Sequence, residues 1–115
     1  MISKEHRFQG LGSLRFVYRR GDTVRGPLYS LKAVRNNRHD AYRAAVVVSR
    51  KVNKSAVVRN RIRRRLYESL RQIENQIVSP HDLVITVFSD KVVDEPAGSL
   101  QKQLQKQLRQ AGVIE

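Results

Sequence analysis

The feature that constrains this chain most is an apolar stripe within its most basic segment. From residue 55 onward, apolar side chains recur every three or four residues, at Val58, Ile62, Leu66, Leu70, Ile73 and Ile77. This spacing places them on one face of an α-helix, and that face must be buried against another element. Ser79 and Pro80 then end the pattern. The chain is therefore expected to fold around one long amphipathic helix.

The same segment carries an unusual density of positive charge. Residues 50–65 hold 8 basic residues and no acid, and no acidic residue occurs between Asp40 and Glu68. Like charges one turn apart on a helix repel each other, and a phosphate backbone would remove that cost. The alternative is a solvated helix face, but such a face normally interleaves glutamates with its cations. We therefore favour a polyanion as the partner of this helix.

The predicted helix has an inward and an outward side. At about 100° per residue, Arg61 and Arg63 fall to either side of Ile62, while Asn60 and Arg64 lie nearly opposite it. Arginine suits the outward side because its planar fork pairs two phosphate oxygens and its face stacks on bases. Composition alone does not separate DNA from RNA as the partner.

The whole chain also carries an excess of positive charge, and this charge is unevenly distributed. Its 115 residues hold 23 Lys+Arg against 10 Asp+Glu, which gives a formal net charge of +13. Residues 1–71 carry +15 and residues 72–115 carry −2, so the binding face is expected in the first two thirds of the chain. Nucleic acid or an anionic membrane could neutralise such a surface. The sequence has no run of about 18 apolar residues to span a bilayer, and residues 1–10 lack the apolar core of a signal peptide.

Two further helices are predicted, one near each end of the chain. Residues 11–18 place apolar side chains at helical spacing ahead of Gly21, and residues 96–111 do the same ahead of Gly112. Glycine is common just beyond the last turn of a helix, where it adopts the left-handed backbone conformation without strain. Residues 1–9 are expected to be poorly ordered.

Strand-forming segments lie between these helices. Residues 29–34 alternate apolar and polar side chains, and residues 44–49 and 83–88 are short apolar runs rich in β-branched residues. Residues 22–28 read as a loop that could include one further short strand. The order is α-β-β-(β)-α-β-α in one domain, residues 1–115. This predicts an α+β fold, an α/β sandwich in which a small mixed sheet packs with about three helices.

Several aromatic and polar residues are assigned from their settings. Phe8, Tyr29 and Phe88 are expected to belong to the core rather than to stack on bases. His81 and Asp82 precede a predicted strand and are interpreted as a turn.

No catalytic or metal site is predicted in the protein. His6, His39 and His81 are scattered and lack partners at metal-ligand spacing. No Gly-rich phosphate loop or nucleophile motif occurs. Because the chain has no cysteine, disulfides and thiolate metal sites are excluded, and a cytoplasmic location is the simpler interpretation.

The arginine segment also carries a family resemblance. Residues 49–68, SRKVNKSAVVRNRIRRRLYE, resemble the signature of the bacterial ribonuclease P protein, whose core reads roughly K-x-A-x-x-R-N-R-x-[KR]-R. Residues 14–21, LRFVYRRG, look like the family's N-terminal helix, which commonly ends in an aromatic residue, two basic residues and glycine. The order of the strands and the Leu-rich last helix are similar too, so the resemblance covers nearly the whole chain.

The resemblance implies a function in a ribonucleoprotein. Members of the family bind a large catalytic RNA and help it to cut the 5′ leader from precursor tRNA. The RNA would perform the phosphodiester chemistry with bound Mg²⁺, and the protein alone would be inactive, without a cofactor of its own. The implied partners are ribonuclease P RNA and precursor tRNA, with no DNA and no membrane. The resemblance also implies a left-handed crossover through the arginine helix, where the general expectation is right-handed.

Carried onto this sequence, the resemblance implies two sets of RNA-contacting residues. The RNA subunit would contact Arg50, Lys51, Lys54, Arg59, Asn60, Arg61, Arg63, Arg64 and Arg65. The leader would contact Leu14, Phe16, Tyr18 and Lys32. Leu14 and Lys32 stand where other members carry aromatic residues, which reduces the stacking expected on unpaired bases. Two roles are open for Asn60, which either braces neighbouring arginines or contacts RNA directly.

Two other functions fit the charge pattern. A ribosomal protein or RNA chaperone with a similar arginine helix would bind unrelated structured RNAs with comparable affinity. A DNA-binding helix module is disfavoured, because the arginine helix has no recognisable helix-turn-helix partner. Binding of duplex DNA and of structured RNA at one fixed salt concentration would separate these functions, since salt changes such affinities strongly.

Overall fold

The predicted order of elements is confirmed. A computed structural model describes residues 6, 8, 11–36, 38 and 41–115, without the side chains of residues 11–13. Its helices and strands are α1 (Leu11–Arg20), β1 (Asp22–Arg25), β2 (Tyr29–Arg35), β3 (Arg43–Val48), α2 (Ala56–Ile73), β4 (His81–Val87) and α3 (Ala97–Gln110). Two short 3₁₀ helices, η2 (Glu74–Gln76) and η3 (Asp90–Val93), flank β4 in the chain. The α+β fold predicted from the periodicities is therefore the observed one.

The sheet is mixed and has the strand order β1-β2-β4-β3. β1 and β4 pair with β2 in the antiparallel sense, whereas β3 and β4 are parallel. Ile85 at the centre of β4 lies between Leu31 of β2 and Val46 of β3. Since parallel neighbours need a crossover connection, the chain passes from β3 to β4 through α2. The left hand implied for this crossover stays a prediction.

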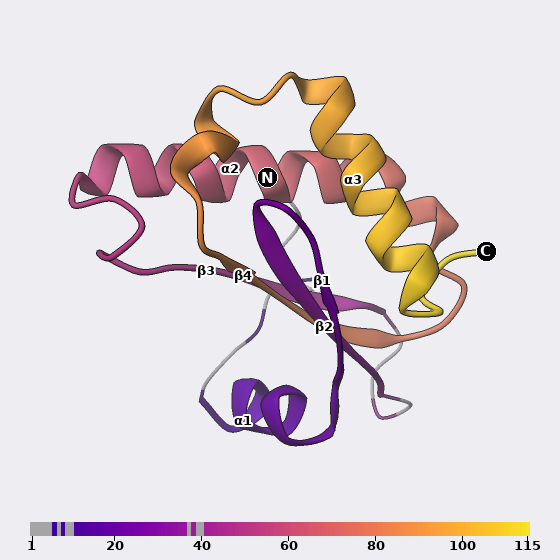
Figure 1. The fold of residues 1–115 in the computed structure, drawn as a ribbon. Helices are drawn as coiled ribbons and strands as arrows, with labels where there is room; N and C mark the ends of the chain where they lie inside the picture. The colour runs from indigo at the N-terminus through magenta and orange to yellow at the C-terminus, as the bar shows by residue number, and fades with distance from the viewer. Residues whose placement is uncertain (1–5, 7, 9–10, 37, 39–40) are drawn as a thin grey trace.

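The helices cover the two faces of the sheet unequally (Figure 1). α2 and α3 lie on one face, and α1 lies on the other. On the α2/α3 face, alternate residues of β2 and β4, such as Leu31 and Ile85, are fully buried in the main core. On the α1 face, Val17 and Val84 are fully buried, but Thr86 is exposed. The second face therefore keeps open surface beside α1.

The arginine helix is shorter than its apolar stripe predicts. Ser55 caps its N-terminus, where the side-chain oxygen accepts a hydrogen bond from the Val58 amide at 3.3 Å. α2 ends at Ile73, and η2 follows, so Ile77 lies beyond the helix. The tighter i→i+3 bonding of η2 ends the regular α-helix one turn early and leads the chain toward β4. The predicted continuation to Ile77 was wrong.

Both glycines predicted at helix ends have that position. The Gly21 amide donates to the Val17 carbonyl at 2.7 Å, and a Cβ at this glycine would come within 2.6 Å of the same oxygen. Gly112 follows α3 with φ of +76°, the left-handed conformation that favours glycine.

Residues 22–28 contain the further short strand that the sequence allowed in this loop. Asp22–Arg25 forms the edge strand β1, with Thr23 opposite Lys32 of β2. Three of the four residues of this strand are exposed. It carries no alternation of buried and polar positions, so only the partner strand, which supplies the ladder hydrogen bonds, makes it a strand.

His81 and Asp82 do not form the predicted turn, because both belong to β4. Asp82 is 1% exposed and accepts hydrogen bonds from Asn36 at 2.8 Å and from the Arg43 guanidinium at 3.0 and 2.8 Å. These partners explain why a carboxylate can be buried in a strand. A single sequence does not show them, because Arg43 and Asn36 are distant along the chain.

The three aromatic residues assigned to the core have different positions. Tyr29 is fully buried, as predicted. Phe88 is 40% exposed, which makes the core prediction wrong for this residue, since it follows the strand and lies on the open face. Phe8 is half-buried, with the Arg43 guanidinium 4.9 Å from its ring centre. The prediction of poor order for residues 1–9 falls mostly outside the described residues, of which His6 stacks on Tyr42 at 4.0 Å.

Candidate nucleic-acid interface

The loop that precedes α2 is held in place by one arginine of the helix. The Arg59 guanidinium donates to the carbonyls of Asn53 and Lys54 at 3.0 and 2.9 Å. Asn53 also caps the loop from the other side, because its Oδ1 accepts from the Ser55 amide at 2.9 Å. Arg59 therefore fixes the loop that carries Arg50, Lys51 and Lys54, and leaves part of its own charge at the surface.

Asn60 braces an arginine. Its Oδ1 accepts a hydrogen bond from Arg63 at 2.7 Å, and a second nitrogen of that guanidinium lies 3.4 Å from the Val48 carbonyl at the end of β3. Asn60 itself is exposed. Of the two roles left open by the sequence, the structure shows the contact that the bracing role requires.

Arg65 is bound by the protein itself. Its guanidinium donates to the backbone carbonyls of Val92, Val93 and Glu95, with a distance of 2.7 Å to Val93. These carbonyls belong to η3 and the turn before α3. Arg65 therefore joins α2 to the segment that leads into α3, and its donors are largely used.

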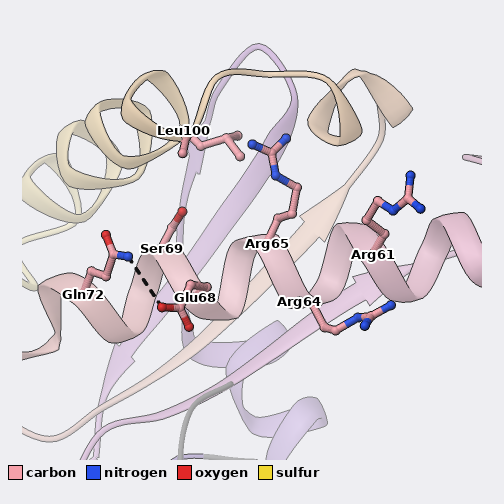
Figure 2. Close-up of a pocket in the computed structure, with 8 residues that line it drawn as sticks. Arg61, Arg64, Arg65, Glu68, Ser69, Gln72 and Leu100 are labelled. Carbon is pink, nitrogen blue, oxygen red and sulfur yellow. Dashed lines mark hydrogen bonds between the residues drawn. The ribbon is translucent and has the colours of Figure 1, made fainter.

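Arg61 and Arg64 stay open. Both are exposed and make no hydrogen bond or ion pair with another described residue. Figure 2 shows their side chains extending from α2 in different directions, Arg61 upward and Arg64 to the lower right. Their donors are available to an external acceptor such as phosphate.

A second open group of cations surrounds the start of α2. Arg50, Lys51 and Lys54 are exposed, and within the described part of the chain their side chains have no hydrogen-bonded or ion-pair partner. Together with Ala56 and Arg59 they line a shallow cavity of about 580 Å³. The set predicted for the RNA subunit thus contains two groups of open cations, one around the start of α2 and one at Arg61 and Arg64.

The basic surface ends where the first acid of α2 appears. Glu68 pairs with Arg71 at 2.6 Å, and this hydrogen-bonded arginine lowers the pKa of the Glu68 carboxyl to about 2. The carboxylate is therefore ionised at neutral pH. The uninterrupted run of positive charge on α2 therefore stops at this ion pair.

The predicted leader residues divide into two groups. Tyr18 is 45% exposed, and Lys32 donates from Nζ to its backbone carbonyl at 2.8 Å, with Nζ 5.7 Å from the centre of its ring. Leu14 is half-buried one helical turn earlier on the same side. Phe16 is 38% exposed, but it lies about 160° around α1 from Tyr18. The structure therefore brings Tyr18, Lys32 and Leu14 together and leaves Phe16 apart.

The sequence interpretation missed one cation–π pair, which includes the exposed Phe88. The Arg25 guanidinium lies 4.7 Å from the centre of the Phe88 ring. Through the strand register, Arg25 is opposite Ser30, which is opposite Thr86, so these residues share the α1 face of the sheet. Thr86 and Phe88 are two residues apart, and strand alternation alone could have placed them on one face.

The described residues lack two further features. They contain no group of three or more His, Cys, Asp and Glu side chains that could hold a metal ion. They also include no helix that is long and apolar enough to cross a membrane.

The family and the fold are shown by known proteins. The model of the family Ribonuclease P matches residues 2–112. The chain is 33% identical to the ribonuclease P protein component of Chloroflexus aurantiacus over 98% of its own length and 82% of the relative's. It is 34% identical to that of Gluconacetobacter diazotrophicus over 98% and 97% of the two lengths.

Two solved structures share the fold. The ribonuclease P protein of Staphylococcus aureus superposes with a TM-score of 0.82 at 23% identity, over 96% of this chain and 98% of that one. The Thermotoga maritima protein gives 0.74 at 20% identity, over 84% and 89%. At these identities the structures support the fold alone, whereas the family match and the two curated relatives support membership. The chain belongs to the ribonuclease P protein family.

Proposed function

We propose that this chain is the protein subunit of a ribonuclease P ribonucleoprotein, in which it binds the catalytic RNA and the 5′ leader of precursor tRNA. The single observation that carries this proposal is the division of the cations of α2. Arg59, Arg63 and Arg65 bind protein groups and fix the surface, while Arg61 and Arg64 have open donors. A surface that is already fixed around open guanidinium groups suits a rigid polyanion, because the helix and the loop before it need no reordering on binding.

The RNA subunit is proposed to bind along α2 and the loop before it. Arg61 and Arg64 would pair with phosphates directly, together with Arg50, Lys51 and Lys54 of the loop. Arg59, Asn60 and Arg63 would hold this surface in position and add charge at its edge. Arg65 would act mainly by holding η3, although the resemblance placed it among the RNA contacts.

The leader is proposed to cross the α1 face of the sheet. Tyr18 would stack on an unpaired base, and Lys32, held against Tyr18, would pair with a neighbouring phosphate. Leu14 would extend the apolar side of this contact by one turn. Phe16, on another side of α1, is the weakest member of the proposed leader set.

The chemistry of cleavage is proposed to belong to the RNA. The protein would contribute binding and position, and Mg²⁺ would be held by the RNA subunit. We also propose a cytoplasmic location, where precursor tRNA is made in bacteria. The protein alone is then expected not to cleave precursor tRNA.

Cleavage of a 5′-labelled precursor tRNA at low Mg²⁺ tests the proposal. Bacterial ribonuclease P RNA should cut at the 5′ junction much faster with this protein than without it. Substitution of Arg61 and Arg64 by Ala should remove most of the stimulation, because two phosphate contacts are lost. A matched variant with Lys102 and Lys106, exposed cations of α3, changed to Ala loses the same charge elsewhere and should keep the stimulation. Cleavage by the protein after rigorous removal of RNA would contradict the proposal.

A further inference from the structure

A groove lies between α2 and α3, on the face of the sheet opposite α1 (Figure 2). Its volume is about 450 Å³, in the range of cavities that hold small ligands. The resemblance assigns the arginines of α2 as a group, but it assigns nothing to the α3 side of this groove, where Ala97 and Leu100 lie.

The floor of the groove is apolar and fixed. Leu100 is 1% exposed and Ser69 is 8% exposed, so both present a packed surface rather than mobile side chains. Arg65 forms part of the wall, and its hydrogen bonds to the carbonyls of Val93 and Glu95 keep it from swinging into the space. A flat, uncharged group could lie on this floor without reorganisation of the protein.

One end of the groove is positive. Arg61 and Arg64 line it with donors that no described residue uses. Ala97 also lines the groove and is the first residue of α3, so the positive end of that helix dipole adds to the field. Arg61 and Arg64 are one turn apart on α2, so each offers a guanidinium group to a phosphate at this end.

The other end carries no net positive charge. Glu68 is paired with Arg71 and lies within 3.5 Å of the Gln72 amide nitrogen, which holds both side chains along this end. This ion pair offers no attraction to a second phosphate. The groove therefore favours a ligand with one anionic end and one uncharged ring, in the orientation that places the anion near Arg64.

We propose that this groove receives one unpaired nucleotide of the ribonuclease P RNA. Its phosphate lies against Arg61 and Arg64, and its base lies over Ser69 and Leu100. RNA-binding proteins commonly stack splayed-out bases on aromatic rings or on arginine guanidinium planes, and Arg65 supplies such a plane in the wall of this groove. The inference rests on the proposed function, and it names the RNA subunit because the leader site around Tyr18 lies on the opposite face of the sheet.

A matched pair of tryptophan substitutions tests this site. Ala97→Trp fills the groove from its exposed rim. Gly98→Trp adds the same ring at the next position. Gly98 does not line the groove, and a Cβ there would meet nothing within 4 Å. Neither change alters charge. Ala97→Phe is the second filling variant, and circular dichroism with thermal unfolding verifies that each variant is folded.

Affinity for ribonuclease P RNA is measured by filter binding over a series of salt concentrations. Loss of a base contact should weaken the binding of Ala97→Trp about tenfold relative to Gly98→Trp. The slope of log affinity against log salt concentration should be the same for both variants, because no phosphate contact is removed. Chemical probing of the RNA should show one unpaired base that wild type and Gly98→Trp protect and both filling variants expose.

The other outcomes overturn the inference. Equal affinities of the filling variants and Gly98→Trp would mean that the groove is empty in the complex. A loss of precursor tRNA binding, with unchanged binding of the RNA subunit, would mean that the occupant was assigned to the wrong RNA. Failure of the wild-type protein to stimulate cleavage would instead contradict the proposed function, and this result is independent of the groove variants.

Discussion

The two faces of the sheet differ in how completely their side chains are buried. The face covered by α2 and α3 contains the main core, with Leu31 and Ile85 fully buried. The α1 face is buried around Val17 and Val84 but open at Thr86. Stability therefore comes mostly from one face, while the other keeps surface available for a ligand (Figure 1).

Cations on both faces are divided between the fold and the surface. On the α1 face, Arg43 pairs with the buried Asp82, while Lys32 lies at the surface beside Tyr18. On the α2/α3 face, Arg65 binds backbone carbonyls, while Arg64 is open. Charge in the sequence alone does not reveal this division, because it depends on which acceptors the fold brings within reach.

The largest effect is expected from breaking the buried pair on the α1 face. Asp82→Ala leaves the Arg43 guanidinium, whose side chain is 14% exposed, without its carboxylate. Removal of one partner of a buried pair destabilises by about 3–5 kcal/mol. Urea unfolding measures this loss, and Asp94→Ala, at an exposed position, is the control, with a change within about 0.5 kcal/mol. A small effect of Asp82→Ala would show that the α1 face does not need its ion pair.

The next effect compares two adjacent arginines of α2. Arg65→Ala should lower the free energy of unfolding by about 1.5–3 kcal/mol, since three carbonyls lose a charged donor. Arg64→Ala should change stability by less than about 0.5 kcal/mol and weaken binding of the RNA subunit more than Arg65→Ala does. Urea unfolding and filter binding of both variants measure the two quantities. If both arginines affected only RNA binding, the division into fold and surface cations would be wrong.

The sequence predicts the architecture well because periodicity is a local property. The stripe through Ile62 and Leu70 predicts α2, and Gly21 and Gly112 mark helix ends. Where the prediction failed, the deciding contact is distant in sequence. Asp82, interpreted as part of a turn, is buried in β4 against Asn36 and Arg43.

The same reasoning applies to the candidate site. The cluster of arginines and its polyanionic partner can be inferred from charge density alone. The roles of Arg65 and Arg63 cannot, because the carbonyls of Val93 and Val48 supply the acceptors from other elements. Phe88 was assigned to the core because it ends an apolar run, although it shares the open face with Thr86.

A smaller effect is expected at the leader site. Tyr18→Ala should weaken binding of precursor tRNA by the holoenzyme by about 1–3 kcal/mol, the range for one base stacked on one aromatic ring. Tyr18→Phe keeps the ring and should retain most of the affinity. Phe16→Ala, on another side of α1, should have the smaller effect. Binding of precursor tRNA with and without a leader measures the difference, and equal effects of Tyr18→Ala on both substrates would place Tyr18 outside the leader site.

The smallest expected effect is a pH dependence of the stability that the Glu68–Arg71 pair contributes. The hydrogen-bonded Arg71 lowers the pKa of Glu68 from 4.5 to about 2. Because the folded-state pKa lies below the unfolded one, the pair stabilises the fold fully above the ordinary value of 4.5, and this contribution is lost as the pH falls toward 2. Both side chains are well exposed, at 49% and 40%, so water and salt weaken the pair.

Glu68→Gln separates this charge from the shape of the side chain. At neutral pH and low salt the wild type should be slightly more stable than Glu68→Gln in urea unfolding, and the two should converge between pH 4.5 and 2. High salt should narrow the difference at neutral pH. A difference that persists at pH 2 would mean that hydrogen bonding rather than charge holds Arg71. In that case Glu68 would no longer act as the electrostatic boundary of the surface on α2, and phosphate could be accepted further toward Ile73.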